Sequence, residues 1–251
     1  MSKDFYIYGK KPIEELLARD PKSLKRIYIK DGVKQASFEK IRELANAGHV
    51  PINGIDDRQI TRLLEDEVNH QGVIALSKPF EYATLDAWIH TLDMKKMPTV
   101  LILDHIQDVS NLGAIIRSAT AAGVAGIIVA ELNQAPVTSA VYKTSAGTVG
   151  KIPLIQVGNI NQTIEKLKKA GFWLVGLGMD TEKGTTDLWK YDFSEPTAVV
   201  IGNEGEGLRE KTREHCDTIV SITMQNDVES LNASVSGALV CYEILRQRKE
   251  K

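Results

Sequence analysis

The chain has 251 residues, of which 43% are hydrophobic, and its formal net charge is −2 at pH 7. That length and apolar share suffice for one large globular domain or two modest ones, and the charge argues against a uniformly basic nucleic-acid binder while leaving local basic patches open. The sequence shows no signal-peptide pattern and no run of about 18 apolar residues, so we expect a cytoplasmic protein without a membrane partner.

Cysteine and histidine patterns predict neither a disulfide framework nor a metal site. Cys216 and Cys241 are the only two cysteines, and they lie far apart without CxxC spacing. The five histidines also lack the spacing of metal ligands. We therefore expect two buried free thiols and no bound metal.

Residues 1–78 predict a small α/β domain. Short apolar strands alternate with amphipathic helices, with strands expected at 24–29, 50–52 and 72–76 and helices after Gly9, at 38–47 and at 57–64. Residues 1–42 contain eleven Lys or Arg against six Asp or Glu, a net charge of +5. This basic segment could contact phosphate, or it could be an ordinary solvated surface.

Residues 79–98 are predicted to form a linker with one helix at 84–92, and residues 99–251 to form a larger domain. Continuous apolar strands alternate there with helices, which is typical of a parallel sheet. The strands are expected at 100–103, 126–130, 152–157, 172–177, 199–201 and 219–222, and the helices at 113–122, 160–170 and 233–248. Val235, Ala238, Tyr242 and Leu245 form an apolar stripe on the last helix, and this stripe needs a partner in the same or another chain.

Residues 198–236 predict a ligand site, because two strands end there in polar loops, and ligands bind beyond the carboxyl ends of parallel strands. In the first loop, 202–207, the glycines follow the pattern GxxGxG. This differs from the dinucleotide-binding GxGxxG, and no GK[ST] follows it. Its two carboxylates disfavour a pyrophosphate and suit a cationic ligand. A purely structural turn is the alternative.

Asn111 and Arg117 lie where another strand passes into an apolar helix. Asn111 could cap that helix or belong to a site. Arg117 needs an acceptor in a salt bridge or a place at a cleft edge, because a guanidinium is costly to bury unpaired.

Three segments together resemble the signature motifs of the SpoU (TrmH-like) branch of SPOUT RNA methyltransferases. They are Asp104 with residues 111–119, then 201–208, then 229–234, in this order. Tyr8-Gly9 and residues 70–73 resemble the N-terminal substrate-binding domain of bacterial ribosomal RNA guanosine 2′-O-methyltransferases. The resemblance therefore covers almost the whole chain. Thr223 and Asn226 depart from it, standing where proline and glycine are usual, but Asn tolerates positive φ, so the turn should survive.

The resemblance implies an α/β fold with two parts, a C-terminal parallel-sheet SPOUT domain that contains a trefoil knot and a small N-terminal RNA-binding domain resembling ribosomal proteins. It implies S-adenosylmethionine (AdoMet) as cofactor and a homodimer formed through the C-terminal domain. The positions that match cofactor-binding residues are Gly178, Gly202, Ile222, Met224 and Leu231. The positions that match catalytic residues are Asn111, Arg117, Glu204, Ser230 and Asn232. Residues 143–148 resemble a loop near the active site, with a plain polar turn as the alternative.

The function implied by this resemblance is AdoMet-dependent methylation of a ribose 2′-hydroxyl, on a guanosine of 23S rRNA. The alternatives within the same class are a tRNA guanosine 2′-O-methyltransferase and an antibiotic-resistance rRNA methylase. An RNA-binding protein that kept the fold and lost catalysis is the alternative from a different class.

Overall fold

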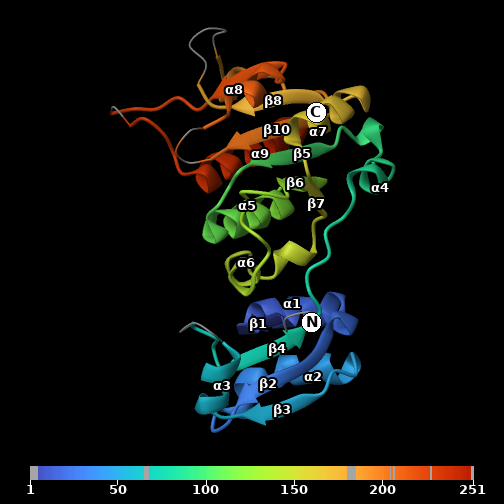
Figure 1. The fold of residues 1–251 in the computed structure, drawn as a ribbon, viewed down its shortest axis with the longest axis vertical. Coiled ribbons are helices and arrows are strands. Elements are labelled where there is room, and N and C mark those ends of the chain that lie inside the picture. Colours follow the sequence, from blue (N-terminus) through green and yellow to red (C-terminus); the bar gives the residue numbers. More distant parts are fainter. Residues whose placement is uncertain are drawn as a thin grey trace. The chain divides into compact units, whose positions relative to one another are not determined.

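The computed structural model describes residues 5–64, 68–179, 185–203, 205, 207–226 and 228–249 (Figure 1). The chain divides into two compact units. The first comprises Met1–Glu81 together with Val137–Gly150, and the second comprises Tyr82–Pro136 and Lys151–Lys251.

The first unit contains a four-stranded sheet in the order β1 (Phe5–Tyr8), β4 (Val73–Ser77), β2 (Leu24–Lys30) and β3 (Ile52–Ile55). Strand β4 is antiparallel to β1 and β2, whereas β3 is parallel to β2. Its helices are α1 (Lys10–Arg19), α2 (Glu39–Ala47) and α3 (Asp57–Leu63). Helix α3 starts at a capping box between Asp56 and Gln59, which satisfies backbone N–H groups at the helix start.

Val137–Gly150 belongs to the first unit although the prediction placed it in the C-terminal domain. Its helix α6 (Ser139–Thr144) packs on β1, where the Ser139 hydroxyl donates to the Tyr6 carbonyl and Lys143 Nζ donates to the Asn69 carbonyl at 2.8 Å. Residues 143–148, predicted as a loop, thus begin in a helix. Its interaction partners lie more than seventy residues away in the sequence, so local patterning could not reveal this packing.

The second unit contains a seven-stranded sheet in which every strand pair is parallel. This confirms the predicted parallel sheet, while the trefoil knot stays a prediction. The strand order is β7 (Leu154–Val157), β6 (Gly126–Ala130), β5 (Thr99–Asp104), β10 (Thr197–Gly202), β8 (Trp173–Leu177), β11 (Thr218–Ser221) and β9 (Thr186–Asp187).

The helices of the second unit are α4 (Leu85–Ile89), α5 (Val109–Ala121), α7 (Ile160–Lys169), α8 (Glu210–Glu214) and α9 (Ala233–Lys249). Residues 82–98 of the predicted linker belong to this unit, and Leu85 and Trp88 of α4 are buried in its core. Helix α5 starts at Val109, four residues before the predicted position, and the carboxylate of the preceding Asp108 accepts the backbone N–H of Asn111 at 2.7 Å. Asp108 is therefore the cap, and Asn111 is not.

Helix α9 packs along α5 through a face that differs from the predicted stripe (Figure 1). Gly237, Val240 and Cys241 are buried, whereas Val235 and Tyr242 are 46% and 50% exposed. Gly237 allows close approach to Ile115 of α5, and Val235 and Tyr242 lie on another face. The apolar stripe of the sequence is thus left largely uncovered within this chain.

Candidate functional site

A cleft of about 390 Å³ opens at the carboxyl ends of the neighbouring strands β8, β10 and β11. The loop after each strand contributes to its lining, with Gly178 after β8, Gly202 at the end of β10 and Ile222 after β11. Ligands of open parallel sheets bind at this edge, and the volume falls in the range of small-molecule sites. The cleft is therefore the candidate site.

Gly202 allows two backbone segments to meet at the cleft. A Cβ atom at this position would lie 2.1 Å from the carbonyl carbon and oxygen of Gly207, a distance that no side chain can adopt. The loop folds back because Gly207 N–H donates to the Asn203 carbonyl at 3.1 Å, and Gly207 has φ +65°. The spacing of Gly202 and Gly207 thus allows a tight turn that places backbone atoms at the wall of the cleft.

All five predicted cofactor-binding residues line this one cleft. Three loops contribute them, and the side chains of Leu177, Ile201 and Leu208 add apolar walls. The five are Gly178, Gly202, Ile222, Met224 and Leu231. Their individual contacts with a cofactor stay predictions.

Arg213 of α8 also lines the cleft, and sequence reasoning missed it. Its Nε is buried without a hydrogen-bond partner among the described residues, and its Nη2 donates weakly to the Leu208 carbonyl at 3.5 Å. A buried guanidinium N–H without an acceptor is costly, so the site fits a ligand that carries an anionic group. In the sequence, an arginine in a short polar helix gives no signal that separates it from a surface residue.

Asn111 and Asn232 are 121 residues apart in sequence and meet at the starts of α5 and α9. Asn232 Nδ2 donates to Asn111 Oδ1 at 3.0 Å, and Asn232 Oδ1 accepts from the Ser234 backbone N–H at 2.9 Å and from its hydroxyl at 2.6 Å. These bonds orient both amides and join the two helix starts. Ser230, two residues before Asn232, lines the cleft.

Arg117 and Glu204 are the remaining two predicted catalytic residues. The Arg117 side chain is exposed, and within the described ranges it makes no ion pair, so the salt-bridge alternative finds no support there. An exposed guanidinium is available to an anionic substrate. Glu204 lies outside the described residues.

Asp104 anchors the loop that borders the cleft. Its side chain is fully buried and accepts from Arg209 Nη2 at 2.6 Å, from Arg209 Nε at 3.1 Å and from the Thr212 hydroxyl at 2.9 Å. His105 Nδ1 lies 2.7 Å from the same carboxylate. Because Arg209 directly follows Leu208 of the cleft wall, this bidentate pair holds the loop against β5.

The two departures from the family pattern are accommodated locally. Asn226 has φ +56°, which confirms that the turn survives with asparagine in place of glycine. The Thr223 hydroxyl donates to Asp187 Oδ2, and this bond, together with one from the Trp189 backbone N–H, lowers the pKa of Asp187. This bond connects the loop after β11, which contains Thr223, to Asp187 of β9.

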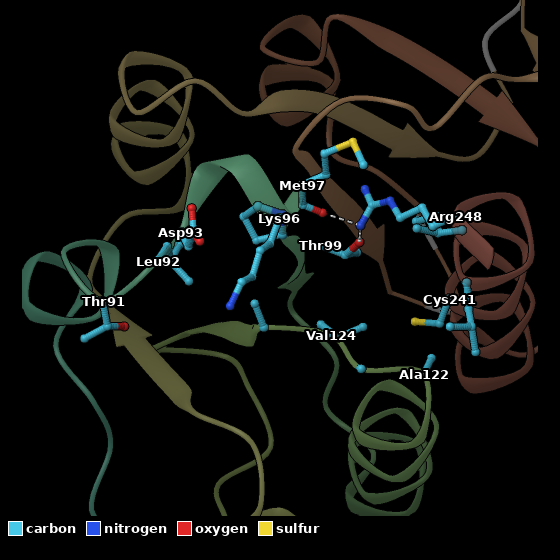
Figure 2. A pocket seen from close by; sticks show the side chains of 15 residues that line it. Thr91, Leu92, Asp93, Lys96, Met97, Thr99, Ala122, Val124, Cys241 and Arg248 are labelled. Carbon is cyan, nitrogen blue, oxygen red and sulfur yellow. Dashed lines mark hydrogen bonds between the residues drawn. The ribbon is translucent and has the colours of Figure 1, made fainter. Parts of the chain in front are cut away.

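A separate hollow of about 490 Å³ lies away from these strand ends (Figure 2). Arg248 lines it and donates to Thr99 Oγ1 at 2.6 Å, to the Met97 carbonyl and to the Glu195 carbonyl at 3.1 Å. Burial lowers the pKa of Arg248. Since its donors are engaged by the chain itself, this arginine fastens the end of α9 to the start of β5.

No group of three or more His, Cys, Asp or Glu in the described ranges is arranged to hold a metal ion. No helix among those residues is both long and apolar enough to cross a membrane.

Family comparisons cover both units. A model of the SpoU rRNA Methylase family matches residues 98–242, and a model described as RNA 2′-O ribose methyltransferase substrate binding matches residues 6–83. The chain belongs to the SpoU family. The match confirms the predicted parallel-sheet domain with a smaller N-terminal α/β domain, and an AdoMet-dependent RNA methyltransferase.

Relatives of this SpoU protein match over nearly the full length. The chain is 37% identical to the 23S rRNA (guanosine-2′-O-)-methyltransferase RlmB of Pseudomonas syringae pv. tomato, over 98% of this chain and 96% of that one. It is 36% identical to a putative TrmH family tRNA/rRNA methyltransferase of Staphylococcus saprophyticus, with the same coverage. The SpoU methyltransferase AviRb of Streptomyces viridochromogenes, solved with AdoMet, has a TM-score of 0.79 and 26% identity over 99% of this chain and 92% of its own.

Proposed function

We propose that this SpoU protein methylates the 2′-hydroxyl of a guanosine ribose in 23S rRNA, with AdoMet as the methyl donor. The observation that carries the proposal is the cleft, where the five predicted cofactor residues and Ser230 converge. The similarity of the chain to RlmB over both units supports the rRNA target. The match of residues 6–83 to a substrate-binding family supports RNA binding by the N-terminal domain predicted at 1–78.

The cleft's chemistry suits AdoMet. Bound there, AdoMet would supply a methyl group activated by a sulfonium. Gly178, Gly202 and Leu231 would hold it largely through backbone, and the unpaired Nε of Arg213 offers a donor for its carboxylate.

The polar residues beside the cleft would act on the ribose. Alignment of the attacking hydroxyl is a large part of such catalysis, and the Asn111–Asn232 bond preorganises two amides for it. Arg117 would bind the target phosphate, because a guanidinium is a poor base. The proton would then pass to that phosphate or to water. Ser230 and Glu204 would complete the site.

The protein would act as a homodimer in the cytoplasm. The exposed apolar side chains of Val235 and Tyr242 on α9 support pairing through the C-terminal domain, since a stripe of this kind is costly in water.

The proposal is tested by mapping 2′-O-methyl groups in ribosomal RNA with and without the gene, and by methyl transfer from labelled AdoMet to 23S rRNA and to tRNA in vitro. We expect one guanosine of 23S rRNA to lose its methyl group and the purified protein to restore it. An unchanged map with methylated tRNA would support the tRNA alternative, which the mixed description of the staphylococcal relative keeps relevant. RNA binding without any methyl transfer would indicate an inactive binding protein.

A further inference from the structure

A second cleft of about 400 Å³ opens in the same unit, beyond the carboxyl ends of β5, β6 and β7. His105 follows β5, Asn133 follows β6, and Asn159 follows β7 on its walls. The fourth wall is the segment that starts at Arg209. Leu208 lines the AdoMet cleft and Arg209 lines this one, so two consecutive residues, with Cα atoms about 3.8 Å apart, separate the two clefts.

Arg209 presents a preoriented guanidinium edge to this second cleft. Its Nε and Nη2 are held by the buried Asp104 carboxylate, while the side chain as a whole stays 41% exposed. Its Nη1 lies 3.4 Å from His105 Nε2, a long contact that an acceptor oxygen could replace. The geometry of this arginine is therefore fixed before any ligand arrives.

The other polar groups of the second cleft are mainly donors. Asn159 Oδ1 accepts from the Gln162 backbone N–H at 3.0 Å, which leaves Asn159 Nδ2 as a donor. Lys211 adds an exposed ammonium that makes no ion pair within the part of the chain that the structure describes. Glu210 is the one carboxylate in the lining.

We propose that this second cleft binds a backbone phosphate of the RNA next to the nucleotide being methylated. The inference rests on the proposed function, because a ribose held at the AdoMet cleft is flanked by phosphates on the same strand. Cationic and amide donors suit a phosphate oxygen, and the lining contains no Phe, Tyr or Trp on which a base could stack. The second cleft would thus position the strand without reading its sequence.

The decisive comparison is between Lys211→Ala and Lys169→Ala. The start of α7 lines the second cleft, and Lys169 is an exposed lysine at the other end of this helix that does not line it. Lys169→Ala therefore controls for the loss of one positive charge. We expect Lys211→Ala to weaken binding of a 23S rRNA fragment by about 3- to 10-fold near 0.1 M salt. It should also make the slope of log K against log[salt] shallower by about 0.7, the value for one phosphate contact on a single strand. Lys169→Ala should change neither quantity.

His105→Gly provides a second variant, which removes the imidazole contacts with Arg209 and Asp104 without straining the backbone. His105 has φ +69°, which glycine adopts without strain, so the substitution removes the imidazole and leaves the backbone in place. We expect RNA binding to weaken by about 2- to 5-fold, with the dissociation constant for AdoMet unchanged within about twofold.

Equal RNA affinity and equal salt slopes for Lys211→Ala and Lys169→Ala would overturn the proposed phosphate contact. Inorganic phosphate that competes with the fragment in the wild type but not in Lys211→Ala would support it. Failure of the wild type to methylate any rRNA would instead refute the proposed function, and the binding comparison would still decide what the second cleft does.

Discussion

Asp104→Ala should destabilise the second unit, because Asp104 connects β5 to the segment that separates the two clefts. The fully buried carboxylate accepts two hydrogen bonds from Arg209 and one from Thr212. The alanine variant leaves a guanidinium and a hydroxyl without their acceptor. Thr212 is itself buried, so water does not readily replace the lost bond.

The size of the expected destabilisation follows from the burial of Asp104 and the partial exposure of Arg209. Deleting one partner of a buried ion pair costs roughly 3–5 kcal/mol. Arg209 is 41% exposed and can regain water, which reduces the expected loss to about 2–3 kcal/mol. For a unit of this size, 1 kcal/mol corresponds to roughly 2–4 °C, so the melting temperature should fall by about 4–12 °C.

Differential scanning calorimetry measures this fall in melting temperature. The samples are the wild type, Asp104→Ala, Arg209→Ala and the double variant. The transition of the second unit is the one that added AdoMet raises. Arg209→Ala should cost more than Asp104→Ala, because it strands a buried carboxylate, and the double variant should cost less than the sum by about 1–3 kcal/mol. A fall below about 2 °C in Asp104→Ala, or strict additivity, would refute the reasoning.

Three further predictions concern the AdoMet cleft and α9. Gly202→Ala should weaken AdoMet binding, measured by calorimetric titration, at least about tenfold, because its Cβ would meet Gly207 backbone at 2.1 Å. Gly158→Ala, whose Cβ has no neighbour closer than 3.8 Å and which does not line this cleft, is the matched control and should bind normally. Asn232→Asp keeps the acceptor that caps α9 but loses the donor to Asn111, so kcat should fall about tenfold or more at unchanged stability. Asn232→Ala should also lose about 1 kcal/mol of stability, because it removes the cap. An unchanged kcat in Asn232→Asp would count against a catalytic role of the paired amides. The hydrogen bond from Arg246 lowers the pKa of Glu243 in the folded protein. The ionised carboxylate therefore stabilises the fold above the pKa of the unfolded chain, about 4.3. This stabilisation is lost as the pH falls through the lower pKa of the folded protein. Urea unfolding of Glu243→Gln should therefore show a smaller loss of stability than the wild type as the pH is lowered below about 4.3, and parallel pH curves would contradict the pairing.

Much of the candidate site could be predicted because its residues act through local backbone. Strand β5 is apolar at every position from Val100 to Leu103, as strands buried on both faces require, and the polar loops follow such strands directly. The glycine spacing at 202–207 predicted a turn, and positive φ at Asn226 was foreseeable from its side chain. These features depend on neighbours within a few residues.

The partners of the polar side chains could not be predicted in the same way. Arg209 reaches Asp104 across 105 residues, and Asn232 reaches Asn111 across 121. Arg213 gives no pattern of its own, yet it lines the cleft. A pairing of this kind depends on which strands become neighbours, and the placement of β10 between β5 and β8 decides that.

The sequence by itself determined the family, the parallel sheet and the loops that carry the predicted cofactor-binding residues, because hydrophobic runs and glycine positions constrain the chain locally. Only the tertiary structure decided that Val137–Gly150 joins the first unit and that α9 buries Gly237 and Cys241 while Val235 and Tyr242 stay exposed. It alone revealed the second cleft beside the AdoMet site. Burial and pairing are properties of surfaces brought together by folding, and residues far apart in the sequence carry no local sign of which surfaces will meet.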